Sequence, residues 1–285
     1  MKKAILVATI GAMTLGVNAG DYGKAPVDKT PIVECVDIGG EISAGYMSNY
    51  IFYGVEFAGD SVWTDVNYTF DGLAIPITIG AWYLNGINES IGGNGGAGYD
   101  ELDLYVSAAL GTFAGFDVAV GYTQYINPEI RGNFNPFGNR VSGYGEIGLD
   151  ITRSLGFVDL AFQANKAFGG SNTGGTPHGY YYQLGVEKSF GLTDNISLVL
   201  GTGVGYSDNY FGAAAAGGNI SDSGWNHYYV TASLPIVLNC RTTLTPYVGF
   251  NGAPDTWIAD GQANGAIGDT QSDILHGGVT LSVTF

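Results

Sequence analysis

Acidic residues fall on one side of several alternating apolar segments, an arrangement that could attract or bind cations. The members are Glu41, Asp65, Glu101, Asp103, Asp117, Glu146, Asp150, Asp159 and Glu187. Arg140 is the one clear basic residue expected on the same face, so most of these acids cannot form ion pairs. Because an unpaired buried charge is costly, we expect water or cations to reach the carboxylates. The alternative is a plugged interior, in which the acids pair with backbone, Tyr or Ser groups.

Histidine and serine residues are the candidates for hydrolytic or metal chemistry. A hydrolase would need a serine beside a histidine, together with a side chain that orients the histidine. Ser223 lies near His227 in the sequence, but no hydrolase pattern surrounds them. The spacing of His178, His227 and His276 matches no metal site. The sequence therefore predicts no catalytic residue, no metal ligand and no cofactor, so the chain is not expected to be an enzyme.

The acids are positioned by segments in which apolar residues alternate with polar or small ones. In residues 101–112, Leu102, Leu104 and Val106 share one face, while Glu101 and Asp103 share the other. This period of two is typical of β-strands, whose successive side chains point to opposite faces. With 47 glycines and only 13% charged residues, such strands suit a wall that meets lipid on one side and a narrow lumen on the other.

The alternation predicts about twelve strands, with ten or fourteen as alternatives. Their expected ranges are 40–53, 61–71, 73–84, 100–111, 115–126, 139–152, 157–168, 178–190, 195–207, 224–236, 242–251 and 274–285. The connections alternate between short and long, except for a short first outer loop near residues 58–60. Pro76, Pro235 and Pro246 fall inside these strands, where each would remove a ladder hydrogen bond.

No segment after the N-terminal region is apolar enough to be a membrane helix, so a bilayer could be crossed only by strands closed into a barrel. The fold class predicted is all-β, a closed antiparallel transmembrane β-barrel. Outward aromatic residues gather near both strand ends, as membrane interfaces favour. They are Tyr83, Tyr122, Tyr182 and Tyr206 near the long loops, and Phe70, Phe116, Phe190 and Phe285 near the short turns.

The N-terminus has the build of a secretory signal peptide. Lys2 and Lys3 precede a short apolar run, and Ala19 offers a small residue for cleavage. The apolar run is shorter than the roughly 20 residues that span a bilayer. The chain is thus expected to divide into a signal peptide at 1–19, a periplasmic linker at 20–38 and a barrel at 39–285.

The net charge limits the partners that the chain can bind, and the cysteine content allows a disulfide. A net charge of −16 disfavours binding to nucleic acid or to anionic lipid surfaces. Cys35 and Cys240 are the two cysteines, and a disulfide can persist in an exported protein. Closure of the barrel would bring the strands beside both residues together at the periplasmic rim. We therefore predict a disulfide between Cys35 and Cys240.

Two segments resemble known outer-membrane barrels. The last residues, Leu281-Ser282-Val283-Thr284-Phe285, are similar to the terminal strand of outer-membrane β-barrel proteins. In those proteins the final aromatic residue is read by the barrel-insertion machinery. Residues 46–55 resemble the first strand of a family of uncharacterised bacterial outer-membrane barrels, in which the pattern Tyr-x-Ser-x-Tyr-x-Phe-Arg-Gly is common. Tyr53 stands here in place of the arginine. The resemblance implies an outer-membrane location and no particular activity.

The sequence favours a passive, porin-like diffusion channel for small cationic or neutral solutes. An acidic ring near the periplasmic mouth is expected to favour cations, with Asp150 directly across from Asp159. The main alternative is a structural or surface-interaction barrel with a plugged lumen, and an outer-leaflet lipid enzyme is a third class. Expected partners are outer-membrane lipids, small solutes and, through Phe285, the insertion machinery. The natural solute and the oligomeric state stay open.

Overall fold

The computed structural model describes residues 38–90, 98–127, 142–169, 179–210, 223–255, 257–259 and 273–285. The regular elements in these ranges are β1 Gly40–Met47, β2 Tyr50–Phe52, β3 Val55–Ala58, β4 Ser61–Phe70, β5 Ile77–Ser90, β6 Gly98–Phe113, β7 Phe116–Asn127, β8 Ser142–Ser154, β9 Asp159–Gly169, β10 Tyr180–Gly191, β11 Ser197–Asp208, β12 Ser223–Ser233, β13 Ile236–Asn239, β14 Thr242–Gly252 and β15 Asp273–Thr284. Within these ranges there is no helix long and apolar enough to cross a membrane. The expected signal peptide lies outside the described residues.

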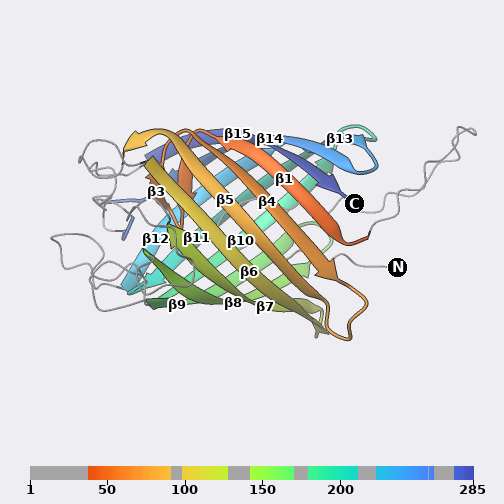
Figure 1. Ribbon diagram of the computed structural model, residues 1–285, viewed down its shortest axis with the longest axis horizontal. Helices are drawn as coiled ribbons and strands as arrows, with labels where there is room; N and C mark the ends of the chain where they lie inside the picture. The colour runs from red at the N-terminus through yellow and green to blue at the C-terminus, as the bar shows by residue number, and fades with distance from the viewer. Residues whose placement is uncertain are drawn as a thin grey trace, which may run out of the picture.

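The strands form a closed antiparallel barrel (Figure 1). Consecutive strands pair from β4 to β12, β1 pairs with β4 and β15, and β14 pairs with β12 and β15. Leu234 and Pro235 interrupt one barrel strand and divide it into β12 and β13, so the barrel has twelve strands. Closure leaves no strand edge without a partner, as a wall surrounded by lipid requires. The predicted fold class is confirmed.

Two of the three prolines lie where strands begin or break, not inside strands as the sequence suggested. Pro76 comes just before β5, and Pro235 lies between β12 and β13. Proline has no N–H to donate, so these positions lose no ladder hydrogen bond. Pro246 does lie within β14, opposite Val279 of β15.

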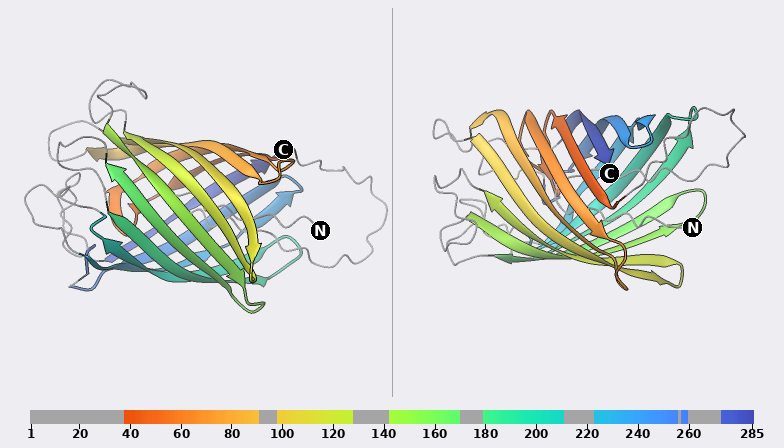
Figure 2. Two further views of the ribbon diagram at one scale, coloured as in Figure 1. Left: turned by 90° about the horizontal axis from the view of Figure 1, so that it is seen from below. Right: turned by 45° about the vertical axis from the view of Figure 1, so that its right-hand side comes forward.

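The two ends of the barrel differ in the length of their connections. One end, called the turn end here, holds the short connections 71–76, 114–115, 155–158, 192–196 and 240–241. The C-terminus lies at this end (Figure 2), and the Phe285 carbonyl accepts hydrogen bonds from the Ile38 and Gly40 amides at 3.0 and 3.1 Å. The opposite end, called the loop end, holds the longer connections, most of which lie outside the described residues.

The outer face of the barrel is apolar because every second residue of each strand points outward. Leu184, Val230 and Leu275 are examples, and the Leu275 side chain is 72% exposed. A lipid-facing band bordered by aromatic residues is expected of a transmembrane barrel. The exposed members of the predicted aromatic belts are Phe70, Tyr83, Phe116, Tyr122 and Phe190.

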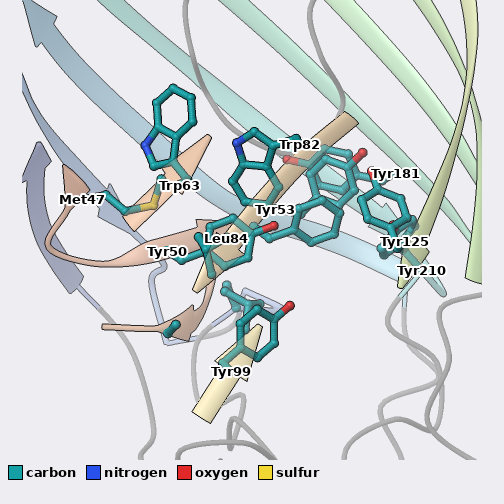
Figure 3. Close-up of a cluster of buried hydrophobic side chains, with 14 of the residues drawn as sticks. Met47, Tyr50, Tyr53, Trp63, Trp82, Leu84, Tyr99, Tyr125, Tyr181 and Tyr210 are labelled. Atoms are coloured by element: carbon teal, nitrogen blue, oxygen red, sulfur yellow. The ribbon is translucent and has the colours of Figure 1, made fainter. Parts of the chain in front are cut away.

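Residues 48–60 form a hairpin inside the barrel, which corrects the predicted first strand at 40–53. β1 ends at Met47, and β2 and β3 form a separate two-stranded sheet. Tyr53 and Gly54 connect β2 to β3 with positive φ angles of 48° and 80°, which makes the turn tight. Side chains of this segment contact β6, β8 and β10 across the interior, and Figure 3 shows Tyr50 and Tyr53 of the segment beside Tyr181 and other side chains of the wall. We call residues 48–60 the lumenal hairpin; it lies near the loop end, where β1 ends and β4 begins.

Candidate functional site

Glu146 of β8 is fully buried and accepts hydrogen bonds from three tyrosines. Tyr53 of the lumenal hairpin and Tyr125 of β7 donate to its Oε1 at 2.8 and 3.4 Å. Tyr210 donates to its Oε2 at 2.5 Å. Tyrosine hydroxyls therefore solvate this carboxylate, a pairing that belongs to the plugged alternative of the sequence analysis.

Tyr53, at the tip of the lumenal hairpin, is enclosed by the barrel wall (Figure 3). Its ring stacks on Tyr181 of β10, with ring centroids 3.7 Å apart. Asn165 of β9 donates to its hydroxyl at 2.5 Å, and Asn226 of β12 donates to its carbonyl at 2.5 Å. In the pattern that this segment resembles, arginine holds the position of Tyr53; in this chain a hydroxyl donor faces the Glu146 carboxylate.

Glu101 of β6 makes a second tyrosine–carboxylate contact with the lumenal hairpin. Tyr50 of β2 donates to its Oε1 and Tyr99 of β6 donates to its Oε2, each at 2.5 Å. The Tyr50 ring also lies 5.5 Å from the Trp82 ring, centroid to centroid. The hairpin is thus bound to the wall through both polar and aromatic contacts, and its side chains form one buried cluster with those of the wall (Figure 3).

Gly54 packs against the ring of His227, and no larger residue fits there. A Cβ added at Gly54 would lie 2.3 Å from that ring, and the φ of 80° favours glycine. We expect Gly54→Ala to displace the hairpin, because strain of about 1–3 kcal/mol adds to the steric overlap. The variant should show a higher single-channel conductance than the native protein. Gly72→Ala is the control, since a Cβ there meets nothing within 4 Å; an unchanged conductance in Gly54→Ala would contradict the expectation.

Asp65, Trp82 and Asp103 lie side by side on β4, β5 and β6, directly opposite one another in register. Tyr105 donates to both oxygens of Asp65, at 3.0 and 2.9 Å. Asp103 is only 2% exposed, and its Oδ1 has no hydrogen-bond partner among the described residues. The row therefore places the Trp82 indole between two carboxyl groups, and the Asp103 Oδ1 is a buried acceptor that no described donor uses.

Five of the predicted acids lie toward the turn end. Asp159, at the start of β9, is exposed and lies directly opposite Glu187 of β10. Like charges in opposed positions are unfavourable unless another group offsets them. Asp150 is buried, whereas the other three are partly exposed. The five are Glu41, Asp117, Asp150, Asp159 and Glu187.

Asp150 does not lie opposite Asp159, which corrects the predicted pairing. The connection comprises residues 155–158 and is not centred on 154–155; the Leu155 amide donates to the Val158 carbonyl at 2.9 Å. Asp159 therefore pairs with Ser154, and Asp150 pairs with Gln163. The longer turn shifts the β8–β9 register by four residues from the predicted one. The acid that does lie opposite Asp159 is Glu187, on the other neighbouring strand, β10.

The basic residues of the described ranges lie outside the lumen. Arg153, Lys166 and Lys188 each lie over an outward-facing aromatic ring, and Arg241 is exposed in the last turn-end connection. In the described part of the chain, the charged side chains on the lumen face are therefore all acidic. Arg140, the base expected to face inward, lies outside the described residues.

The structure does not bring the serine and histidine candidates together. The Ser223 hydroxyl donates to Asp208, while His227 is fully buried and its Nδ1 lies 3.1 Å from the Asn226 amide nitrogen. His276 lies over Gly249 of β14. His178 lies outside the described residues.

The tyrosines that hold the acids were not among the site residues predicted from the sequence. Tyr99 shares the face of Glu101 on β6, and Tyr125, which donates to Glu146, shares the face of Asp117 on β7. The shared alternation places these phenols in the lumen, so the signal was present in each strand. Tyr53 carried a different signal, because the tyrosine-glycine pair that it forms suits a tight turn.

Cys240 lies in the turn between β13 and β14 and is disulfide-bonded. Its predicted partner Cys35 is the other cysteine of the chain and lies outside the described residues. We expect maleimide to label neither thiol in unreduced, denatured protein and to label both after reduction. Cys240→Ser should leave Cys35 free to react. Labelling of both cysteines without reduction would rule out the bond.

The closed barrel, apolar outside and polar inside, has the architecture of outer-membrane β-barrels. No family model matches the sequence, and no curated protein matches it. Among solved structures, the chain is similar to an outer-membrane channel from Pseudomonas putida F1, with a TM-score of 0.51 and 15% identity over 91% of this chain and 100% of the other. It is also similar to the KdgM porin (TM-score 0.49, 8% identity, 86% and 99% covered) and to LpxR from Salmonella typhimurium (0.49, 9%, 86% and 100%). At these identities the likeness concerns the fold alone.

Proposed function

We propose that the protein is an outer-membrane channel that passes small cations and uncharged solutes. The observation that carries the proposal is the sign of the lumen charge, which is acidic throughout the described part of the chain. Acidic rings favour cations in channels. The five turn-end acids form such a ring, and the opposed Asp159 and Glu187 concentrate negative potential at one point of it.

A second function is favoured by the lumenal hairpin, which fills the loop end. The hairpin is held by hydrogen bonds and by stacked rings, and Tyr50, Phe52 and Tyr53 are buried. A barrel that stays closed in this way would serve as a structural or surface-interaction protein. Both functions share the fold, so they differ only in whether the hairpin leaves the lumen.

The proposed location follows from the two ends of the chain and from the outer face. Residues 1–19 would direct export and be removed, and Phe285 would engage the insertion machinery at the end of β15. The apolar outer face would then be covered by outer-membrane lipids. Mass spectrometry of the protein from isolated outer membranes should find an N-terminus at about Gly20.

The proposed channel function is tested by electrical measurements. Purified protein is inserted into planar bilayers under a KCl gradient, and the reversal potential is measured for the native chain and for a chain that lacks the lumenal hairpin. A reversal potential whose sign indicates a preference for potassium supports the proposed cation channel. A preference for chloride contradicts it. Absence of current from both proteins would favour the closed structural barrel.

A further inference from the structure

Tyr53 fills a site whose groups would suit a cation better than a phenol. We propose that Glu146 and the side chains around Tyr53 form a binding site for small organic ammonium ions, and that the lumenal hairpin closes this site until such an ion displaces it. The inference rests on the proposed channel function and adds to it a ligand class and a means of opening.

The carboxyl group of Glu146, beside Tyr53, has no basic partner within the described ranges. Glu146 is fully buried and accepts hydrogen bonds from tyrosine hydroxyls. Asp103, a second lumen acid, is also buried. Buried carboxylates are stabilised far more by a counter-charge than by neutral donors. A cation at this place would therefore bind more strongly than the hydroxyl that it replaces.

Two unused hydrogen-bond acceptors lie beside Tyr53. Asn226 donates to the Tyr53 carbonyl, and Asn165 donates to the Tyr53 hydroxyl, whose proton goes to Glu146. Both amide oxygens are then left without partners among the described residues. A primary ammonium group offers three donors and no acceptor. It would supply what these oxygens lack.

Aromatic rings complete the site. The Tyr53 ring stacks on the Tyr181 ring at 3.7 Å and meets the Tyr210 ring edge-on at 5.1 Å, and the Tyr181 and Tyr210 rings lie 6.0 Å apart, all measured between centroids. Figure 3 shows these three tyrosines together. Withdrawal of Tyr53 would leave the other two rings beside the space that it occupied, next to the Glu146 carboxylate to which Tyr210 donates. A cation near aromatic rings gains a further attraction, which is larger where water is excluded.

The hairpin and the ion exclude each other because both use Glu146 and the Tyr181 ring. β2 and β3 form their own sheet, so the hairpin can leave without breaking the pairing of the barrel strands. A ligand that binds only when the hairpin is displaced shifts the population toward that state. Organic ammonium ions would thereby open the loop end.

The experiment follows the exposure of Val55, which is buried in the hairpin. A Val55→Cys variant is labelled with maleimide in detergent while methylammonium chloride, tetramethylammonium chloride or sodium chloride is raised at matched ionic strength. Methylammonium should speed labelling about tenfold or more, which is the effect of giving the Glu146 carboxylate a charged donor in place of a neutral hydroxyl. Tetramethylammonium, which has no N–H donor, should act more weakly. Sodium should act least.

The second variant removes the charge that binds the ion. Glu146→Gln in the Val55→Cys background should abolish the response to methylammonium, whereas Asp208→Asn, a matched change on the outer face, should keep it. If Glu146→Gln fails to fold, the order of the labelling rates of Val55→Cys in the three salts still tests the inference. Equal labelling in all three salts, or a full response in Glu146→Gln, overturns the inference. The cation preference of the hairpin-less barrel tests the proposed channel function separately. A failure of the ammonium site can therefore be told apart from a failure of the channel function.

Discussion

Replacing residues 48–60 with a two-residue Asn-Gly turn is expected to raise single-channel conductance several-fold. Met47 and Ser61 are directly opposed in the β1–β4 pair, so a short turn can join the strands without a change of register. The variant removes Tyr50, Phe52 and Tyr53 from the lumen. The acids that these residues cover would then meet water, and ions could cross the loop end.

The control for this deletion is a check that the barrel still folds. Circular dichroism should show the same strand content as the native protein, because the strands of the barrel pair without help from the hairpin. A folded variant with native conductance would show that the hairpin does not set the resistance of the pore.

Converting the turn-end acids to amides is expected to remove most of the cation preference. The change is made in the hairpin-less barrel and replaces Asp117, Asp150, Asp159 and Glu187 with Asn or Gln. Neutral amides keep the size of each side chain and remove the negative potential that attracts cations to the mouth. The reversal potential under a KCl gradient should therefore move most of the way to zero.

The matched control is Asp194→Asn, an exposed acid of a turn-end connection that lies outside any strand. It should leave the reversal potential unchanged, because it is screened by bulk solvent. If the multiple amide variant keeps its native reversal potential, the acidic ring is not the source of selectivity.

Alternation in the sequence was enough to predict the barrel but not the lumenal hairpin. Tyr46, Ser48, Tyr50 and Phe52 continue the period of two, so the first strand seemed to run on to residue 53. Alternation describes which side a residue faces, not where the chain leaves the sheet. The break depends on the left-handed backbone at Tyr53 and Gly54 and on contacts with distant strands.

The sequence predicts which acids face the lumen, but it does not predict which side chains contact them. The lumen parity of Asp65, Asp103 and Glu146 follows from strand periodicity, and the structure buries all three. The tyrosine partners of Asp65 and Glu146 lie 21 to 93 residues away along the chain, which a local pattern does not reveal. The pairing of Asp150 with Asp159 failed for a local reason, because the length of a turn sets register and a small error moves every later pair.

The lumenal hairpin also fixes the order in which the protein can assemble. Tyr53 contacts groups that follow it by 93, 112 and 173 residues, on β8, β9 and β12. Contacts of such sequence separation form late, because the loops between them must close first. The wall must therefore be nearly complete before the tip of the hairpin finds its partners. We therefore expect the lumen of a newly folded chain to stay open at the loop end until the hairpin docks.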